Sequence, residues 1–275
     1  MPKIFANGIN IAYDVAGSSD NCLLLVHGHP FNRSMWRPQL NAFCRSNWRV
    51  ITPDLRGYGE SSVVDGKTTL DIFARDLAAL LDSLSIREVV IGGLSMGGQI
   101  VMEFCRLFPD RVRGVLLAAT FPQAETEEGK RNRALMAERL MREGMSAYAE
   151  EVLPKMIAPQ NINALPQVSE HVLTMMQSSP PAGAAAALRG RAERPDYQET
   201  LAGLNAPALI VVGDQDAYTT RADAERMQHL LKRAELVWMK GVGHMPNLEC
   251  EAEFNAGLSR LLDVADQGRA VFGRP

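Results

Sequence analysis

The stretch that decides the fold runs from Val89 to Gln99 and reads VVIGGLSMGGQ. Its β-branched apolar start is typical of a buried strand, and it leads into a Gly-x-Ser-x-Gly turn centred on Ser95. Apolar residues then recur at helical spacing as far as Phe108. A serine at so sharp a strand–turn–helix junction is held in a strained backbone conformation, which aims its hydroxyl away from the sheet. The stretch therefore predicts a nucleophile elbow.

The rest of the chain alternates strand-like and helix-like segments. Short apolar runs predict strands at residues 22–26, 49–51, 115–119, 208–213 and 236–239. Helical patterns cover about 35–47, 68–84 and 249–262, and the tail from 266 carries little that could fold alone. Residues 9–15 alternate apolar and polar side chains, which predicts an antiparallel edge strand. Together they predict an α/β fold, a mostly parallel, doubly wound sheet with its functional loops at the carboxyl ends of the strands.

One long segment interrupts this alternation. Residues 121–205 contain no convincing strand but several helical patterns, and the segment is too structured for a loop. We therefore predict a helical cap (lid) at 121–205, inserted into a core domain made of 1–120 and 206–275. The segment holds six of the 13 methionines, which suit either an adaptable apolar lid or plain packing onto the sheet.

Composition excludes several classes of partner. The net charge is −3, from 29 basic and 32 acidic residues, so we expect neither nucleic acid nor an anionic membrane surface as a partner. The chain has no signal-peptide pattern, and no apolar run approaches the roughly 18 residues of a membrane-spanning helix. The four cysteines form no Cys-x-x-Cys pair, which favours reduced thiols. These features predict a soluble, cytoplasmic protein and leave its oligomeric state open.

Ser95 needs a base, because a serine hydroxyl is a poor nucleophile at neutral pH. His244 follows the last predicted strand, and Asp214 and Asp216 follow the one before it. The chain order Ser95, Asp216, His244 is the order of triad residues in this architecture. We favour Asp216 over Asp214, because Asp214 lies so close to the strand end that its side chain should serve the turn.

The same reasoning predicts the rest of the site. A tetrahedral intermediate needs backbone N–H donors, and those of Met96 and His29 are in the expected places. Pro30 donates no hydrogen bond and restricts His29. Two interpretations stay open: Pro30 aims the His29 carbonyl at the acyl-enzyme, where bound peroxide is favoured over water, or it forms a rigid turn with no effect on the choice between them. Phe121 and Phe31 are predicted walls of the substrate pocket.

Other polar residues are interpreted as structural. Asp54 and Arg56 lie in a glycine-rich turn, where we expect Asp54 to cap and Arg56 to pair. His27 and His29 have metal-like spacing, but no cysteine or acidic cluster lies near them in the sequence. His171 lies in helical surroundings and is expected on the surface or in packing. We therefore expect no metal and no cofactor.

Five short motifs together resemble the α/β-hydrolase fold superfamily. They read HGHP at 27–30, DLRGYGES at 54–61, GLSMGG at 93–98, GDQD at 213–216 and GH at 243–244. The similarity covers about residues 4–120 and 205–263 and is greatest to small serine esterases, enol-lactonases and cofactor-free haloperoxidase-like enzymes. It implies Ser95 as nucleophile, His244 as base, Asp216 as orienting acid, and His29 and Met96 as oxyanion donors. His29 departs from the pattern, since many relatives carry an aromatic or other apolar residue there.

The predicted function is a serine hydrolase that cleaves a small to medium carboxylic ester or lactone through an acyl-enzyme. Two alternatives use the same triad, a C–C bond hydrolase and a perhydrolase or haloperoxidase-like enzyme. A non-enzymatic alternative is a ligand receptor that keeps the fold for its pocket, but such a protein needs a broken triad or very slow turnover. The substrate itself is not encoded in any motif, because specificity belongs to the cap.

Overall fold

The computed structural model describes residues 2–44 and 47–271 and confirms the predicted α/β class. Its eight-stranded sheet has the order β1-β2-β4-β3-β5-β6-β7-β8. The strands are β1 (Lys3–Ala6), β2 (Ile9–Ala16), β3 (Cys22–Val26), β4 (Arg49–Pro53), β5 (Val89–Leu94), β6 (Val112–Ala118), β7 (Ala208–Gly213) and β8 (Ala234–Met239). β2 runs antiparallel to both of its neighbours, β1 and β4. The strands β4-β3-β5-β6-β7-β8 are parallel, so the carboxyl ends of these strands meet at one edge of the sheet.

The prediction that residues 9–15 form an edge strand is wrong. β2 pairs with β4 on one side and with β1 on the other, and β1 is the edge. Three of the four β1 residues are exposed or half-buried, and the strand is joined to β2 by a tight turn at Asn7 and Gly8. A strand of this length is too short to show an alternation of apolar and polar residues, so the sequence does not predict it.

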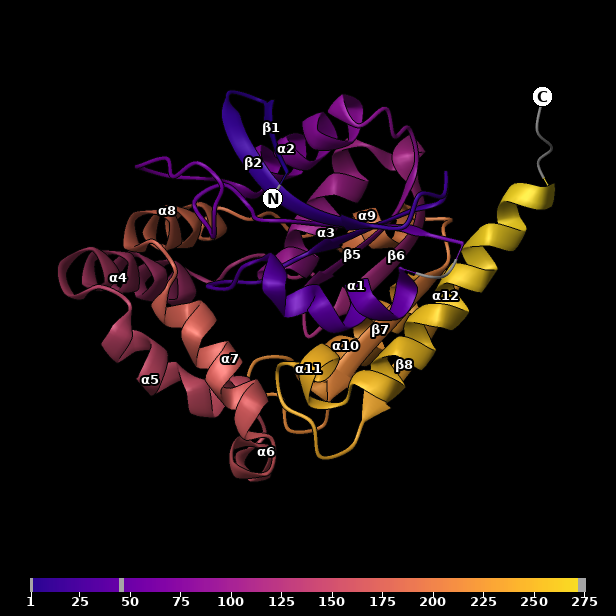
Figure 1. Cartoon of the computed structure of the whole chain (residues 1–275). Helices are drawn as coiled ribbons and strands as arrows, with labels where there is room; N and C mark the ends of the chain where they lie inside the picture. Colours follow the sequence, from indigo (N-terminus) through magenta and orange to yellow (C-terminus); the bar gives the residue numbers. More distant parts are fainter. Residues whose placement is uncertain (1, 45–46, 272–275) are drawn as a thin grey trace.

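Helices cover both faces of the sheet (Figure 1). One face is covered by α2 (Leu70–Ser83), α3 (Met96–Leu107) and α10 (Arg221–Leu230), and the other by α1 (Arg37–Phe43) and α12 (Glu251–Val271). Short helical turns are η1 (Arg33–Trp36), η2 (Pro109–Arg111) and α11 (Pro246–Glu249). The last helix was predicted to end at Leu262, but α12 continues to Val271 and so includes the first part of the tail that was expected to carry little structure. Residues 272–275 of that tail lie outside the described residues.

The side chains of β3 show why the central strands are continuous apolar runs. All five residues from Cys22 to Val26 are buried. Leu23 and Leu25 join the hydrophobic cluster beneath α1 and α12, whereas Leu24 and Val26 join the cluster beneath α2 and α3. Because alternate side chains point to opposite faces, a strand covered on both faces must be apolar at every position.

Six helices lie between β6 and β7, as expected for a strandless segment. They are α4 (Glu127–Glu143), α5 (Ser146–Met156), α6 (Pro159–Ala164), α7 (Pro166–Gln177), α8 (Pro181–Arg191) and α9 (Gln198–Gly203). Helices α4 to α8 gather beside the sheet at the left of Figure 1, where α4 packs on α8 and α5 on α7. α9 packs instead against α3 and α10.

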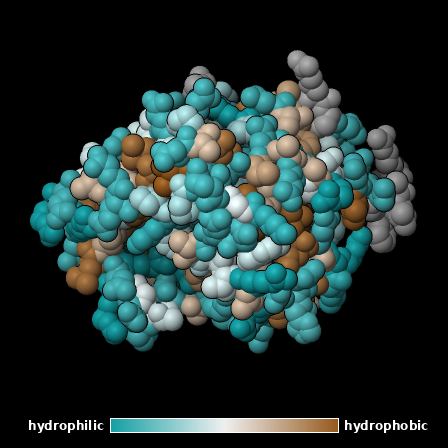
Figure 2. Space-filling view, turned by 90° about the horizontal axis from the view of Figure 1, so that it is seen from below, coloured by the Kyte–Doolittle hydropathy of each residue, from teal (hydrophilic) through white to brown (hydrophobic). Residues whose placement is uncertain are grey.

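The surface of the molecule is mainly polar on the face drawn in Figure 2, where apolar side chains form small, separate groups. Leu135 and Met141 of α4 are among the large apolar side chains that are exposed. Within the part of the chain that the structure describes, no helix combines the length and apolar character that crossing a membrane requires.

Candidate active site

Ser95 lies between β5 and α3 in the strained conformation that the sequence predicts. Its φ and ψ are 58° and −118°, a left-handed backbone conformation that side chains other than glycine rarely adopt. Its N–H donates to the carbonyl of Ala118 at 2.9 Å, and its carbonyl accepts from the Thr120 hydroxyl at 2.9 Å. Ala118 ends β6 and Thr120 lies two residues beyond it, so the neighbouring strand and its loop hold the turn.

The glycines around Ser95 are there because the turn is crowded. A Cβ on Gly93 would lie 2.3 Å from the backbone of Gly97, and a Cβ on Gly97 would lie 2.2 Å from the carbonyl of Val26. Both distances are far below van der Waals contact. The elbow therefore closes only with hydrogen atoms at these two positions, and α3 begins directly against the end of β3.

His244 and Asp216 form a buried hydrogen-bonded pair. The His244 Nδ1–H donates to the Asp216 carboxylate, at 2.9 Å from Oδ1 and 3.0 Å from Oδ2. Burial alone would raise the pKa of Asp216, but the charge and hydrogen bond of His244 and the N–H of Tyr218 hold that pKa below its usual value. Asp216 therefore stays ionised and fixes the His244 ring with Nε2 free of the carboxylate.

Asp214 serves the turn, as expected from its place at the end of β7. Its Oδ1 accepts from the N–H of Gly241 at 2.7 Å, which ties the β7 loop to the loop that carries His244.

Glu249 is a positioning residue that sequence reasoning missed. Its carboxylate accepts from the N–H groups of Gly243 and Met245, on either side of His244, and from the N–H of Ala158, which directly precedes α6. The His244 N–H donates to the carbonyl of Met156 at 3.1 Å. The His244 loop is thus fixed to the helical segment, through a carboxylate that belongs to no sequence motif.

Ser95 and His244 line the same cavity of about 200 Å³ at the carboxyl edge of the sheet. The other lining residues come from the sheet edge and from the helical segment: His29, Gln99, Ala119, Thr120, Phe121, Arg133, Tyr148, Met156, Leu188, Arg191 and Tyr218. The Tyr218 ring stands edge-on to the His244 ring, with centroids 4.9 Å apart. Ser95 and His244 therefore line one cavity together with side chains of the helical segment at residues 121–205.

The two predicted oxyanion donors belong to segments that adjoin Ser95. Met96 is the first residue of α3, where a backbone N–H has no partner within the helix. The loop that carries His29 lies directly against Ser95, since a Cβ on Gly28 would be 3.3 Å from Ser95 Cβ. His29 Nδ1 is 2.7 Å from the Tyr58 hydroxyl, while Nε2 is buried without a partner. Burial, then the charges of Arg191 and Arg133, hold the pKa of His29 well below its usual value.

The two predicted pocket walls lie in different places. Phe121 lines the cavity, and the Arg194 guanidinium lies 4.9 Å from the centre of its ring. Phe31 is buried in the hydrophobic cluster beneath α1 and α12 and is not among the lining residues of the cavity. A contact of Phe31 with substrate stays a prediction.

The polar residues interpreted as structural have structural partners. The Asp54 carboxylate accepts from the N–H groups of Arg33 and Glu60, which caps the turn as predicted. Arg56 pairs with Asp76 of α2 at 2.6 Å.

Both ring nitrogens of His27 form hydrogen bonds with backbone groups. Its Nδ1–H donates to the carbonyl of Gly28 at 2.8 Å, and its Nε2 accepts from the N–H of Leu55 at 2.9 Å. Across residues 2–44 and 47–271, no three histidine, cysteine or acidic side chains are grouped closely enough to hold a metal ion.

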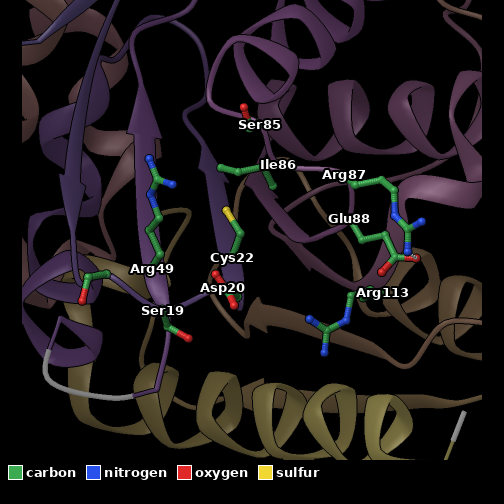
Figure 3. Close-up of a pocket in the computed structure, with 10 residues that line it drawn as sticks. Ser19, Asp20, Cys22, Arg49, Ser85, Ile86, Arg87, Glu88 and Arg113 are labelled. Atoms are coloured by element: carbon green, nitrogen blue, oxygen red, sulfur yellow. Dashed lines mark ion pairs between the residues drawn. The ribbon is translucent and has the colours of Figure 1, made fainter. Parts of the chain in front are cut away.

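A second cavity of about 270 Å³ lies at the opposite, amino ends of the strands (Figure 3). Its side chains include Cys22 at the start of β3, Arg49 at the start of β4 and Arg113 near the start of β6. Burial raises the pKa of the Cys22 thiol to about 12, which makes it a poor nucleophile at neutral pH. None of the predicted site residues lines this cavity.

Comparison with known proteins agrees with the fold. The model of the alpha/beta hydrolase family matches residues 23–256. A solved thermophilic esterase from Thermogutta terrifontis, with malate bound, superposes with a TM-score of 0.92 and 36% identity, over 96% of this chain and 98% of that one. The enol-lactonase from Burkholderia xenovorans superposes with a TM-score of 0.88 and 26% identity, over 95% and 100%. The curated 3-oxoadipate enol-lactonase 2 of Acinetobacter baylyi is 27% identical over 94% of each chain.

The sheet order, the strained serine and the buried histidine–aspartate pair define an enzyme of the hydrolase class with an α/β sheet. The chain belongs to the alpha/beta hydrolase family.

Proposed function

We propose that the protein hydrolyses small to medium carboxylic esters or lactones through an acyl-enzyme on Ser95. The observation that supports this most directly is the arrangement of Ser95 and His244 in one cavity, with His244 bound to ionised Asp216. The similarity to an esterase and to enol-lactonases supports the same class of substrate.

In the proposed reaction, Ser95 Oγ attacks the scissile carbonyl while His244 Nε2 takes its proton. The N–H groups of Met96 and His29 stabilise the oxyanion. His244 then protonates the leaving alkoxide, which gives the acyl-enzyme. Water attacks the acyl group while His244 takes its proton, the bond to Ser95 Oγ breaks as His244 returns that proton to Oγ, and the carboxylic acid leaves. Asp216 keeps its charge throughout and stabilises the imidazolium that forms.

Residues 121–205 act as the cap in this proposal. Helices α4, α5 and α8 contribute Arg133, Tyr148, Met156, Leu188 and Arg191 to the cavity wall. Met156 lines the cavity, while Met145, Met175 and Met176 are buried in the packing of the segment. Substrate selection by these side chains explains why the motifs of the core name no substrate.

Turnover of a chain-length series of p-nitrophenyl esters and simple lactones tests the proposal. We expect hydrolysis by the wild type and a loss on the order of 10⁶ in kcat for Ser95→Ala, with circular dichroism showing an unchanged fold. A Ser95→Ala variant with wild-type kcat would contradict it. Parallel assays with a dienol ketone, and with acetate plus hydrogen peroxide, test the C–C hydrolase and perhydrolase alternatives. Failure to turn over any of these compounds would favour the receptor alternative.

A further inference from the structure

Arg191 is a buried cation in the wall of the cavity. It is the last residue of α8 and is 8% exposed. Its Nε donates to the amide oxygen of Gln99 at 3.1 Å, and no carboxylate of the described residues forms an ion pair with it. A neutral amide compensates a buried charge only in part, so this arrangement costs stability in the empty protein.

The neighbouring charges increase that cost. Arg133 and Arg194 both pair with the single carboxylate of Glu125, the latter at 2.9 Å. Two guanidinium groups therefore occupy the one carboxylate at this side of the site, and none is left for Arg191. Burial, followed by the charges of Arg133 and Arg194, lowers the pKa of Arg191 well below its usual value. Since a guanidinium keeps its proton in proteins, the unfavourable charge remains and favours binding of an anion.

Gln99 fixes the place of this charge relative to the nucleophile. Gln99 and Ser95 lie one helical turn apart on α3, and the Gln99 N–H donates to the Ser95 carbonyl at 3.2 Å. Four residues of α-helix correspond to roughly 6 Å along the axis. The Arg191 guanidinium is bound to the Gln99 side chain and lines the same cavity of about 200 Å³ as Ser95, so the acyl part of a substrate held at Ser95 shares this cavity with the guanidinium.

We propose that Arg191 binds a carboxylate on the acyl part of the substrate, so that the protein prefers half-esters of short dicarboxylic acids, or lactones bearing a carboxylate, over neutral compounds. The proposal rests on the proposed function of Ser95. A guanidinium suits this role because its planar donors match both oxygens of a carboxylate. Neutral His29, with Nε2 unpartnered in the same cavity, offers a second polar contact without competing charge.

The experiment compares mono-p-nitrophenyl glutarate with p-nitrophenyl pentanoate, whose acyl chain has the same number of carbons but no charge. We expect the wild type to have the higher kcat/KM on the glutarate half-ester. Arg191→Gln should lower the glutarate-to-pentanoate ratio by on the order of 10- to 100-fold, the loss of a charged hydrogen bond. Arg189→Gln is the matched control, because this half-buried arginine of the same helix binds the carbonyl of Gly66 instead, and it should keep the wild-type ratio.

Stability gives a readout that does not depend on turnover. We expect glutarate to raise the Tm of Ser95→Ala and to lose this effect when Arg191→Gln is added. In the absence of glutarate, Arg191→Gln should be as stable as the wild type or more so, because it removes an unpaired buried charge. A wild-type ratio in Arg191→Gln, or glutarate stabilisation that survives this substitution, would overturn the proposal.

The two proposals fail in different ways. If pentanoate hydrolysis depends on Ser95 while the wild type shows no preference for the half-ester, the assignment of Arg191 is wrong and the proposed function stands. If neither ester is hydrolysed through Ser95, the proposed function fails, and the dependence of glutarate stabilisation on Arg191 still decides whether the cavity binds carboxylates.

Discussion

Asp214 and Asp216 are two residues apart and have different hydrogen-bond partners. Asp216 binds His244 Nδ1, whereas Asp214 accepts the N–H of Gly241. The first bond fixes the proton on Nδ1 and leaves Nε2 for the proposed proton transfers, and the second holds a turn. Their separate roles follow from the register of β7, which ends at Gly213.

We predict that Asp216→Asn lowers kcat by roughly 10⁴, because an amide does not fix the tautomer of His244 or stabilise its charged form. Asp214→Asn should keep kcat within a few-fold of the wild type and change the free energy of unfolding by less than about 1 kcal/mol, because the asparagine Oδ1 still accepts the N–H of Gly241. Ester turnover and urea denaturation of both variants measure these effects. The reverse order of the two kcat values would assign the triad carboxylate to Asp214.

At the scale of residues, the sequence predicts groups that belong to motifs and misses groups that act through packing. Ser95, Asp216 and His244 each follow a recognisable strand, so their meeting at one edge follows from the parallel sheet. Arg191 belongs to an alanine-rich helix with no motif, and its burial arises only when α8 packs on α3 and α4. Glu249 likewise acts through backbone groups that a sequence does not bring together.

Among the elements, α8 is held by close backbone contacts. A Cβ on Gly183 would lie 1.8 Å from the carbonyl of Gly57, and a Cβ on Gly190 would lie 1.7 Å from the carbonyl of Thr68. The helix that carries Arg191 therefore rests directly on the loops after β4. Its position, and with it the position of the guanidinium, depends on these two glycines.

Gly183→Ala should therefore force α8 away from Gly57 and lower the free energy of unfolding by about 1–3 kcal/mol, the usual cost of overpacking. Gly203→Ala is the matched control, because Gly203 ends α9 and a Cβ there meets nothing within 4 Å. That variant should be as stable as the wild type, or more so by up to about 1 kcal/mol, since alanine favours helix. Equal denaturation curves for Gly183→Ala and the wild type would show that α8 adjusts freely.

The elements with strong periodicity were the predictable ones. β3 and β5 are apolar on both faces, and α3 follows a turn with a defined glycine pattern. β1 was too short to be recognised, which made β2 look like an edge strand. The sequence predicts that the segment between β6 and β7 is helical. It does not predict the bounds and packing of the six helices, because these depend on contacts between segments that carry no sequence motif.

At the scale of the whole molecule, the sheet separates two hydrophobic clusters, and the site lies above both, at the edge where the helical segment meets the strands. The ionisable groups enclosed there make stability depend on pH. His29 is buried and held neutral, so the folded protein does not take up a proton there near pH 6.5, whereas the unfolded chain does. The part of the free energy of unfolding that depends on His29 therefore decreases as the pH falls below that value.

Replacing His29 by phenylalanine should remove this part of the pH dependence. Between about pH 7.5 and 5.5, we expect His29→Phe to lose about 1.4 kcal/mol less in the free energy of unfolding than the wild type. Urea denaturation at both pH values measures the difference, and above about pH 7.5 the offset between the two proteins should stay constant. An equal loss on acidification would show that the folded protein protonates His29.

The expected cytoplasmic location and the division into a core and a cap stay predictions at this scale. Substrate choice was beyond prediction from the motifs, because the motifs belong to the core whereas Arg133, Tyr148 and Arg191 come from the helical segment.

The central claim is that Ser95 is the nucleophile, and covalent labelling tests it most directly. A fluorophosphonate reacts with a serine that a neighbouring base activates, and peptide mass spectrometry of the labelled protein identifies the modified residue. We predict one adduct, on Ser95, formed by the wild type and absent from Ser95→Ala. An adduct on any other residue, or labelling that persists in Ser95→Ala, would contradict it.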